Sequence, residues 1–404
     1  MRILMVTHGF PPDKITGTEW HTYLLAKELS KRHGIHVFSR GSTSSYREYK
    51  CDFHGIAITK IDTPMNYTTL IDAYVDEKVG LSFSKLLEEF KPDIIHIQHC
   101  IHLGLSILEV AIERKIPILL FLHDFYFMCN RVHLLKSDDQ VCSGPKNNNY
   151  CLDCSSAFTP SLTRSHIRSY ALKKYEYVND VLSKIDLIVA ASDFVKKTYE
   201  NNFPSLNKIF VLPLGLDLSF VEKFHHKDRK KFTFGYIGST YHHKGMHILI
   251  EAFKLLKLKN IQLRIYGDGD PKYLKILKSM ASKNMVFLGS YSHDELADVL
   301  SEIDVSILPS LCHESYSFTV REALSVGIPV IVSDLEAQSS SVTNDYNGLH
   351  FKNRDVKDLS EKMYLLANQR ELYQKLSENA KNTPIMSIKE QTNTLEELYQ
   401  KIIR

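Results

Sequence analysis

The chain has 404 residues, of which 44% are apolar and 24% are charged, and its formal net charge is +3. This length favours two domains over one core, and the composition is typical of a globular protein rather than a disordered or fibrous one. A charge so close to balance argues against a nucleic-acid-binding protein, which usually carries a strongly basic face.

No targeting or membrane-spanning segment is predicted. The opening residues, MRILMVTHGF, form an apolar run of the length of one buried strand, without a following cleavage site of small residues. The longest apolar run, 116–122, is far shorter than the ~20 residues that a spanning helix needs. We expect a cytoplasmic protein, for which peripheral attachment to the inner face of a membrane is the remaining form of membrane contact.

Short β-type runs alternate with helical patterns in the first half of the chain. An amphipathic helix is predicted at 18–33, ending before Gly34, and strands at 3–7, 35–39, 93–98, 117–122, 186–190 and 209–213. Strands separated by helices indicate βαβ units and a parallel sheet. We therefore place a first α/β domain at 1–213, with a cysteine-bearing insertion at 126–158.

The second half repeats this pattern. Strands are predicted at 232–237, 261–266, 285–288, 305–308 and 330–332, and helices near 246–258, 271–282, 293–302 and 318–326. We place a second doubly wound domain at 214–386, beginning where apolar LPLGLDLSFV gives way to charged KFHHKDRKK. The amphipathic segment 387–404 is expected to pack back on the first domain.

The most informative segment is ILPSLCHESYSFTVREALSVGIPVIVSD, at 307–334. A strand is followed by a loop and by a helix for which Ser317 is a suitable N-cap. The backbone N–H groups of Phe318 and Thr319, with the helix dipole behind them, favour an anion there. Glu314 precedes this helix and Glu322 lies within it, so that both carboxylates can accept hydrogen bonds from the hydroxyl groups of a sugar or a ribose.

This segment resembles the E-x7-E motif of the retaining GT-B glycosyltransferases of family 4 (glycosyl transferases group 1), and the similarity extends over nearly the whole chain. The resemblance implies an α/β GT-B fold with two facing Rossmann-like doubly wound domains and a cleft between them. The first domain would bind the acceptor and the second the nucleotide-sugar donor. In this family the residue matching Glu314 holds the donor sugar, and the residue matching Glu322 binds the nucleotide ribose.

Three other segments carry the same resemblance. In GFPPDKITGTEWH, Gly17 and Thr18 stand where family members usually have two glycines that bring the backbone close to a phosphate. In YIGSTYHHKG, Gly238 is followed by Ser239 where an arginine is usual, and Lys244 is placed to neutralise the diphosphate. His242 or His243 is a candidate to supply part of the missing positive charge. In FLHDFYF, His123 matches the histidine that contacts the donor sugar.

The insertion holds four grouped cysteines, Cys129, Cys142, Cys151 and Cys154, within CNRVHLLKSDDQVCSGPKNNNYCLDC. One C-x-x-C pair with two further cysteines nearby has the stoichiometry of a structural zinc site. Disulfides are disfavoured in the cytosol, and an iron–sulfur cluster is the alternative metal centre. We expect a structural zinc ion here that shapes a loop on the acceptor side.

The resemblance implies a retaining, hexosyltransferase-type glycosyltransferase that uses a nucleotide-diphosphate sugar. Its acceptor would be a saccharide or a lipid-linked glycan in surface polysaccharide assembly. No Asp-x-Asp pair is placed to hold a catalytic divalent ion, so none is expected. The alternatives are another GT-B enzyme, such as an epimerase or a phosphorylase, and a nucleotide-sugar-binding scaffold without turnover. A dehydrogenase is disfavoured because RIYGDGD does not complete a dinucleotide fingerprint.

Overall fold

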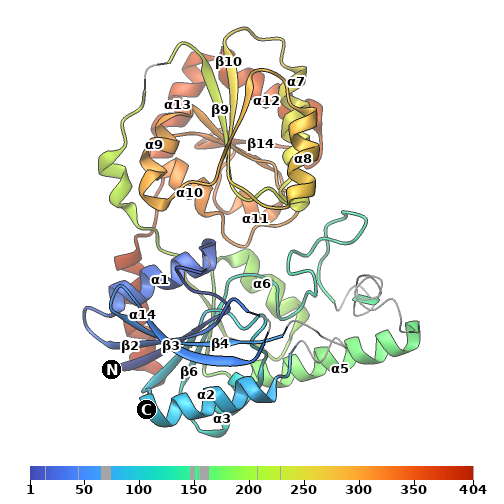
Figure 1. The fold of residues 1–404 in the computed structure, drawn as a ribbon. Coiled ribbons are helices and arrows are strands. Elements are labelled where there is room, and N and C mark those ends of the chain that lie inside the picture. Colours follow the sequence, from blue (N-terminus) through green and yellow to red (C-terminus); the bar gives the residue numbers. More distant parts are fainter. Residues whose placement is uncertain are drawn as a thin grey trace. The chain divides into compact units, whose positions relative to one another are not determined.

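The computed structural model describes residues 1–403 apart from 14, 44, 65–73, 146–150, 153, 155–162, 207 and 228. The chain forms two compact units, each with its own sheet (Figure 1). Unit 1 comprises Met1–Leu134, Cys142–Gly215 and Met386–Arg404, and unit 2 comprises Leu135–Val141 and Leu216–Ile385. The short stretch Leu135–Val141, expected in the first domain, thus belongs to unit 2, and Leu135 is buried in that unit's apolar core.

Unit 1 contains an eight-stranded sheet in the order β3-β4-β2-β1-β5-β6-β7-β8. All its neighbouring strands are parallel except β3 and β4, which form an antiparallel pair at one edge. The strands are β1 (Arg2–Thr7), β2 (Gly34–Arg40), β3 (Arg47–Phe53), β4 (Ile56–Asp62), β5 (Ile94–Ile97), β6 (Ile118–Leu122), β7 (Leu187–Ala190) and β8 (Ile209–Val211).

Helices connect these strands and cover both faces of the sheet, as right-handed βαβ crossovers require. They are α1 (Gly17–Leu29), α2 (Glu77–Phe90), α3 (Ser106–Glu113), α5 (Arg164–Ser183) and α6 (Asp193–Asn202). Helix α1 is shorter than predicted because residues 30–33 turn to lead directly into β2. Neither the β3–β4 pair nor α2 was predicted from the sequence.

The last helix, α14 (Ile388–Ile402), belongs to unit 1 and lies beside α1 (Figure 1). Ser387 caps its start in a reciprocal capping box with Glu390. Its buried side chains reach into the sheet region: the Tyr399 hydroxyl lies 2.6 Å from Nδ1 of His96, and Gln391 Oε1 lies 2.7 Å from Nε2 of His21.

Unit 2 contains a six-stranded, all-parallel sheet in the order β11-β10-β9-β12-β13-β14. Its strands are β9 (Phe232–Ile237), β10 (Ile261–Tyr266), β11 (Met285–Gly289), β12 (Val305–Leu308), β13 (Val330–Ser333) and β14 (Gly348–Phe351). The helices are α7 (Met246–Leu255), α8 (Pro271–Met280), α9 (Leu296–Ser301), α10 (Phe318–Ser325), α11 (Glu336–Ser339), α12 (Val356–Asn368) and α13 (Arg370–Lys381).

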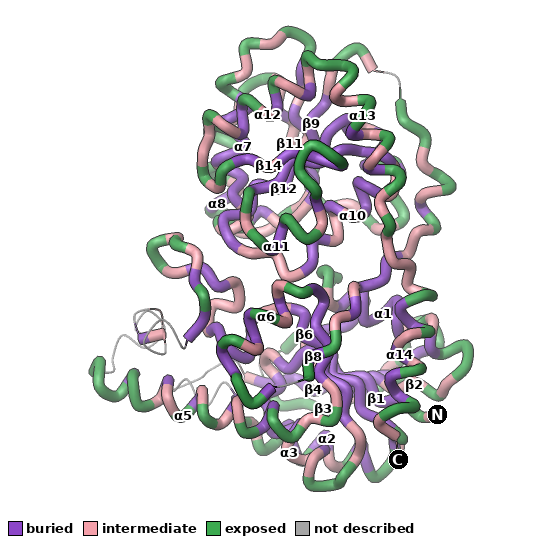
Figure 2. The backbone as a smooth tube through the Cα atoms, turned by 180° about the vertical axis from the view of Figure 1, so that it is seen from behind, coloured by how far each residue is buried: buried purple, intermediate pink, exposed green. Residues whose placement is uncertain are grey.

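Burial follows the layers in both units: strands are buried, and the outer faces of helices are exposed (Figure 2). Parallel strands covered on both faces are near-continuous apolar runs, as ILLFL in β6 and VSIL in β12 illustrate. Within the described part of the chain, no helix combines the length and apolar character needed to cross a membrane. Since all strands except β3 run parallel to their neighbours, the loops that follow these strands gather at one edge of each sheet, and the candidate site residues lie there.

Candidate functional site

An ion pair joins two of the predicted donor-site residues in unit 2. Nζ of Lys244 lies 2.8 Å from Oε1 and 3.0 Å from Oε2 of Glu314, and the Ser310 hydroxyl also donates to this carboxylate. The side chains are only 22% and 14% exposed. Burial alone would raise the pKa of Glu314, but the charge of Lys244 and the two hydrogen bonds outweigh it and lower this pKa. Both groups are therefore charged at neutral pH.

The loops that carry this pair are held together through their backbones. Lys244 ends the 3-10 turn His242–Lys244 after β9, and Glu314 lies in the loop after β12. The Leu311 N–H donates to the His243 carbonyl at 2.9 Å. Gly245 has a φ of 69°, and a Cβ atom there would lie 1.9 Å from the Pro309 carbonyl oxygen. Only glycine permits the close approach that brings the ammonium to the carboxylate.

Helix α10 begins directly after the Glu314 loop. Ser317 occupies the N-cap position as predicted, but its side chain makes no capping hydrogen bond. Its carbonyl instead accepts from both the backbone N–H and Nη1 of Arg321, each at 3.3 Å. Phe318 and Thr319 form the first turn, where the dipole of the helix places partial positive charge. The guanidinium of Arg321 lies 3.6 Å from the ring centre of Tyr316, which fixes this cation beside the helix start.

Glu322 lies on α10 and is only 9% exposed. Burial raises its pKa from the ordinary value of 4.5 to about 7. Among the described residues no cation lies within ion-pair distance to offset this effect, in contrast to Glu314. A buried carboxyl of this kind gains from hydrogen-bond donors supplied by a ligand, and strongly perturbed carboxyls are enriched at functional sites.

The turn after β9 places Gly238 and Ser239 at the same edge of the sheet as Lys244. The Gly238 N–H donates to the Tyr266 carbonyl at 3.0 Å, and the Ser239 carbonyl accepts from the Tyr236 hydroxyl at 2.6 Å. These contacts fix the turn to its own sheet and leave Ser239 partly exposed.

His242 does not supply the cation that Ser239 lacks. Its Nε2 lies 2.8 Å from Oδ2 of Asp139, and its ring stacks on that of His247 with centres 4.9 Å apart. A protonated His242 would therefore be neutralised by this carboxylate. Lys244 and Arg321 are cations beside the donor-site residues, and the charge of His243, the other candidate, also lowers the pKa of Glu314.

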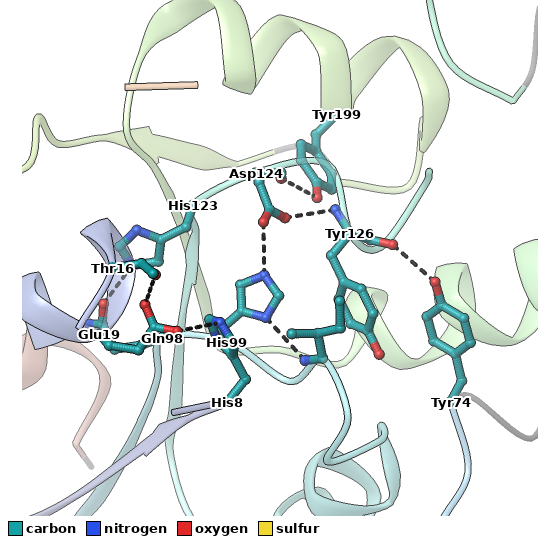
Figure 3. Close-up of polar contacts among 11 residues, drawn as sticks. His8, Thr16, Glu19, Tyr74, Gln98, His99, His123, Asp124, Tyr126 and Tyr199 are labelled. Atoms are coloured by element: carbon teal, nitrogen blue, oxygen red, sulfur yellow. Dashed lines mark hydrogen bonds and ion pairs between the residues drawn. The ribbon is translucent and has the colours of Figure 1, made fainter. Parts of the chain in front are cut away.

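In unit 1, the predicted residue His123 follows β6 and belongs to a buried polar network (Figure 3). Gln98, after β5, connects it to His96: its amide oxygen lies 2.5 Å from His123 Nε2, and its amide nitrogen lies 2.7 Å from His96 Nε2. Because an amide oxygen only accepts and an amide nitrogen only donates, His123 carries its proton on Nε2 and His96 on Nδ1. His96 then donates to the Tyr399 hydroxyl.

Burial keeps these histidines neutral. It lowers the pKa of His96 to about 3 and that of His21 to about 4, and it holds the pKa of His123 well below 6.5. Neighbouring histidine charges lower the pKa of His123 further. At neutral pH, His123 is therefore a fixed tautomer with Nδ1 as its acceptor atom.

Two histidine–carboxylate pairs lie beside this network (Figure 3). His8, after β1, has Nε2 2.9 Å from Oε1 of Glu19, a fully buried residue in the first turn of α1. His99 Nε2 lies 3.0 Å from Oδ2 of Asp124, while its Nδ1 accepts from the Ile101 N–H. The rings of His8 and His99 are 4.5 Å apart, so the two pairs form one cluster.

Gly17 and Thr18 start helix α1, in the same turn as the buried Glu19. Gly17 is exposed, and the Thr18 carbonyl accepts from the Thr22 hydroxyl at 2.7 Å. The Thr16 hydroxyl contacts Glu19. A buried carboxyl group, that of Glu19, therefore lies beside Gly17 and Thr18 at the start of this helix.

The sequence interpretation did not single out Ser310, His8, Glu19, Gln98 or His99. One signal was available for three of them: His8 and His99 each directly follow a predicted strand, as His123 does, and Gln98 is the last residue of one. Polar residues at that position in a parallel sheet lie at the ligand-binding edge. Glu19 carried no such signal, because an acidic residue in the first turn of a helix is common.

Comparisons with known proteins agree with this architecture. Residues 15–220, about half of the chain, match the profile of Glycosyltransferase Family 4, and residues 219–383 match that of Glycosyl transferases group 1. The structure of HepE from Anabaena in complex with UDP and glucose superposes with a TM-score of 0.73, covering 98% of this chain and 99% of that one. At 14% identity this likeness supports the fold alone.

Two characterised relatives match over shorter stretches. The N,N'-diacetylbacillosaminyl-diphospho-undecaprenol alpha-1,3-N-acetylgalactosaminyltransferase of Campylobacter jejuni is 32% identical over 138 residues, 34% of this chain and 36% of that protein. The UDP-Gal:alpha-D-GlcNAc-diphosphoundecaprenol alpha-1,3-galactosyltransferase of Escherichia coli is 29% identical over 167 residues, 37% of this chain and 42% of that protein. Each match thus spans less than half of the relative. The predicted GT-B fold is confirmed, and the chain belongs to glycosyltransferase family 4.

Proposed function

We propose that the chain is a retaining glycosyltransferase that moves a sugar from a nucleotide diphosphate to a hydroxyl of a saccharide or lipid-linked acceptor. The observation that carries the proposal is the Lys244–Glu314 pair beside the start of α10, with Glu322 buried one turn into that helix. One cation and two carboxyl groups with opposite pKa shifts suit a ligand that has an anionic diphosphate and two sets of sugar hydroxyls.

In the proposed donor complex, the diphosphate takes Lys244 away from Glu314. The ammonium and the positive end of α10 then balance the phosphate charge. Glu314, released from its ion pair, accepts hydrogen bonds from the transferred sugar, and Glu322 accepts them from the ribose. The resting ion pair thus keeps both groups charged and in place until a donor arrives.

The transfer step exchanges one bond at the anomeric carbon for another. The bond to the diphosphate oxygen breaks, and a bond to the acceptor oxygen forms on the same face of the sugar. The acceptor proton passes to the leaving diphosphate oxygen, so no protein base is needed. Lys244 stabilises the charge that develops on the leaving group, and we propose no catalytic divalent ion.

His123 is assigned to the donor sugar by resemblance, and its surroundings suit this role. The hydrogen bond to Gln98 fixes its tautomer, and its lowered pKa keeps the ring neutral. Nδ1 is therefore an acceptor for a sugar hydroxyl. The names of the two relatives, which act on sugars linked to diphospho-undecaprenol, favour a lipid-linked acceptor in surface glycan assembly.

Calorimetric titration with UDP, GDP and ADP, followed by sugars of the preferred nucleotide, tests the donor site. We expect one nucleotide to bind clearly best and Glu322→Ala to weaken it, whereas Glu361→Ala, on the distant helix α12, should leave binding unchanged. Release of nucleotide that depends on an added lipid-linked acceptor would support transfer. Binding without turnover on any acceptor would favour a nucleotide-sugar-binding scaffold, and no binding at all would refute the proposal.

A further inference from the structure

The insertion between β6 and α5 gathers four cysteines in unit 1. Cys129 and Cys142 are buried, each with 8% exposure, and Cys151 and Cys154 are partly buried. All four are reduced. Among the described residues, no three His, Cys, Asp or Glu side chains already surround a common metal position.

A backbone N–H group points at one of the sulfurs. That of Gly144, two residues after the cysteine, donates to Sγ of Cys142 at 3.4 Å. A thiol is a weak hydrogen-bond acceptor, whereas a thiolate is a strong one. This loop is therefore shaped to stabilise sulfur that carries negative charge, as a metal ligand does.

The loop after Cys142 is fixed from outside the insertion. Gly144 has a φ of 105°, and a Cβ atom there would lie 2.4 Å from the Asn202 side chain. The Asn202 amide donates to the Ser143 carbonyl at 2.9 Å. Helix α6 thus holds this N–H···S turn against the body of unit 1.

The other two cysteines follow in the same insertion. Cys129 and Cys142 belong to one buried apolar cluster of unit 1. Cys151 lines a small cavity together with Asn130, the residue after Cys129, and with Lys174. Cys129, Cys142 and Cys151 therefore lie in one part of the fold, and Cys154 completes the C-x-x-C pair with Cys151.

A buried cation faces the same place. Lys174, on α5, is only 6% exposed; its ammonium contacts Asn130 and lies 4.4 Å from the ring centre of Tyr74. No carboxylate of the described residues forms an ion pair with it, and Cys151 lines the same cavity. An unpaired buried cation is costly, and thiolate charge would offset it.

We propose that Cys129, Cys142, Cys151 and Cys154 bind one Zn²⁺ ion as four thiolates, with Lys174 compensating the net negative charge of the centre. Four thiolates are a common ligand set of structural zinc. Each thiol loses its proton as it binds, so zinc affinity falls as the pH is lowered. The ion draws the sulfurs to a common centre and fixes the insertion. This proposal does not depend on sugar transfer.

Metal analysis of the full chain, purified without chelators under reducing conditions, tests the site. We expect one zinc ion per chain, and at least a roughly tenfold lower content in Cys129→Ser and Cys154→Ser. Cys51→Ser, on the edge strand β3, is the matched control and should keep its zinc. A wild-type chain without zinc would overturn the proposal, as would iron with the visible absorption of an iron–sulfur cluster.

Two further measurements guard against variants that fail to fold. Co²⁺ added to the metal-free wild-type chain should produce strong thiolate-to-cobalt charge-transfer absorption, and its absence would refute a four-thiolate site. Lys174→Met keeps every ligand and should lose zinc to a competing chelator at about tenfold lower chelator concentration. Lys173→Met, its exposed neighbour, should behave as wild type. Equal retention by both lysine variants would contradict the assigned role of Lys174.

Discussion

Replacing Gly245 by alanine tests whether the contact between two loops positions the donor-site ion pair. At a φ of 69°, an L-residue costs about 1–2 kcal/mol. The new Cβ would also lie 1.9 Å from the Pro309 carbonyl oxygen, whereas such atoms essentially never approach within 3.0 Å. The loops must therefore separate by about 1 Å, which moves Lys244 away from Glu314. A displacement of ~1 Å at a reacting centre can cost about 100-fold in rate.

Gly289→Ala is the matched control for this change. Gly289 has a φ of 75°, but an added Cβ atom there meets nothing within 4 Å. The positive φ should therefore destabilise both variants, and the unfolding temperature of each should be lower than that of the wild type. Only Gly245→Ala should also lose donor turnover, measured as nucleotide release from the sugar donor that the binding screen selects. Equal turnover by the two variants would refute the argument that this close approach positions Lys244.

Three further predictions concern the electrostatics of the site and the last helix. Lys244→Met and Glu314→Gln should each lower the free energy of unfolding of the ligand-free protein by about 2 kcal/mol in denaturant unfolding. The double variant should lose clearly less than the sum of the two, because neither charge is then left without its partner. Simple additivity would contradict the ion pair. Burial raises the pKa of Glu322 to about 7, so its protonation stabilises the fold fully below pH 4.5 and this contribution is lost as the pH rises through 7. Nucleotide affinity should fall below pH 7, where Glu322 becomes protonated, and Glu322→Gln should remove this part of the pH dependence. Parallel plots of affinity against pH for the wild type and this variant would exclude Glu322 from the site. Tyr399→Phe should lower the free energy of unfolding by about 1–2 kcal/mol, because His96 loses its hydrogen-bond partner. Tyr364→Phe, on the exposed face of α12, should change this free energy little. Equal unfolding midpoints for the two variants would refute the buried hydrogen bond.

Much of the fold followed from the sequence because parallel strands are buried on both faces. The runs at β6 and β12 could be assigned from their apolar character, and the loop after each was then expected at the ligand-binding edge. The E-x7-E spacing placed Glu314 before a helix and Glu322 within it, as the structure has them. Their opposite pKa shifts could not be predicted, since these depend on Lys244 and on burial.

Strand β3, at the edge of the sheet of unit 1, was missed because it lacks this signal. In β3, REYKCDF alternates exposed and partly buried residues and is strongly polar, and it is stabilised by antiparallel pairing with β4. The polar network was missed for a different reason. Its partners, such as His96 and Tyr399, are 303 positions apart, and only the folded sheet brings them together.

The fastening of α14 into unit 1 has a consequence for the order in which the chain is made. Tyr399 and Gln391 complete a network whose other members lie near the beginning of the sequence. During synthesis from the amino terminus, every residue of Leu216–Ile385 leaves the ribosome before these two do. All of unit 2 is therefore available for folding before unit 1 is, and the histidine network of the part that is made first stays incomplete until Gln391 and Tyr399 emerge.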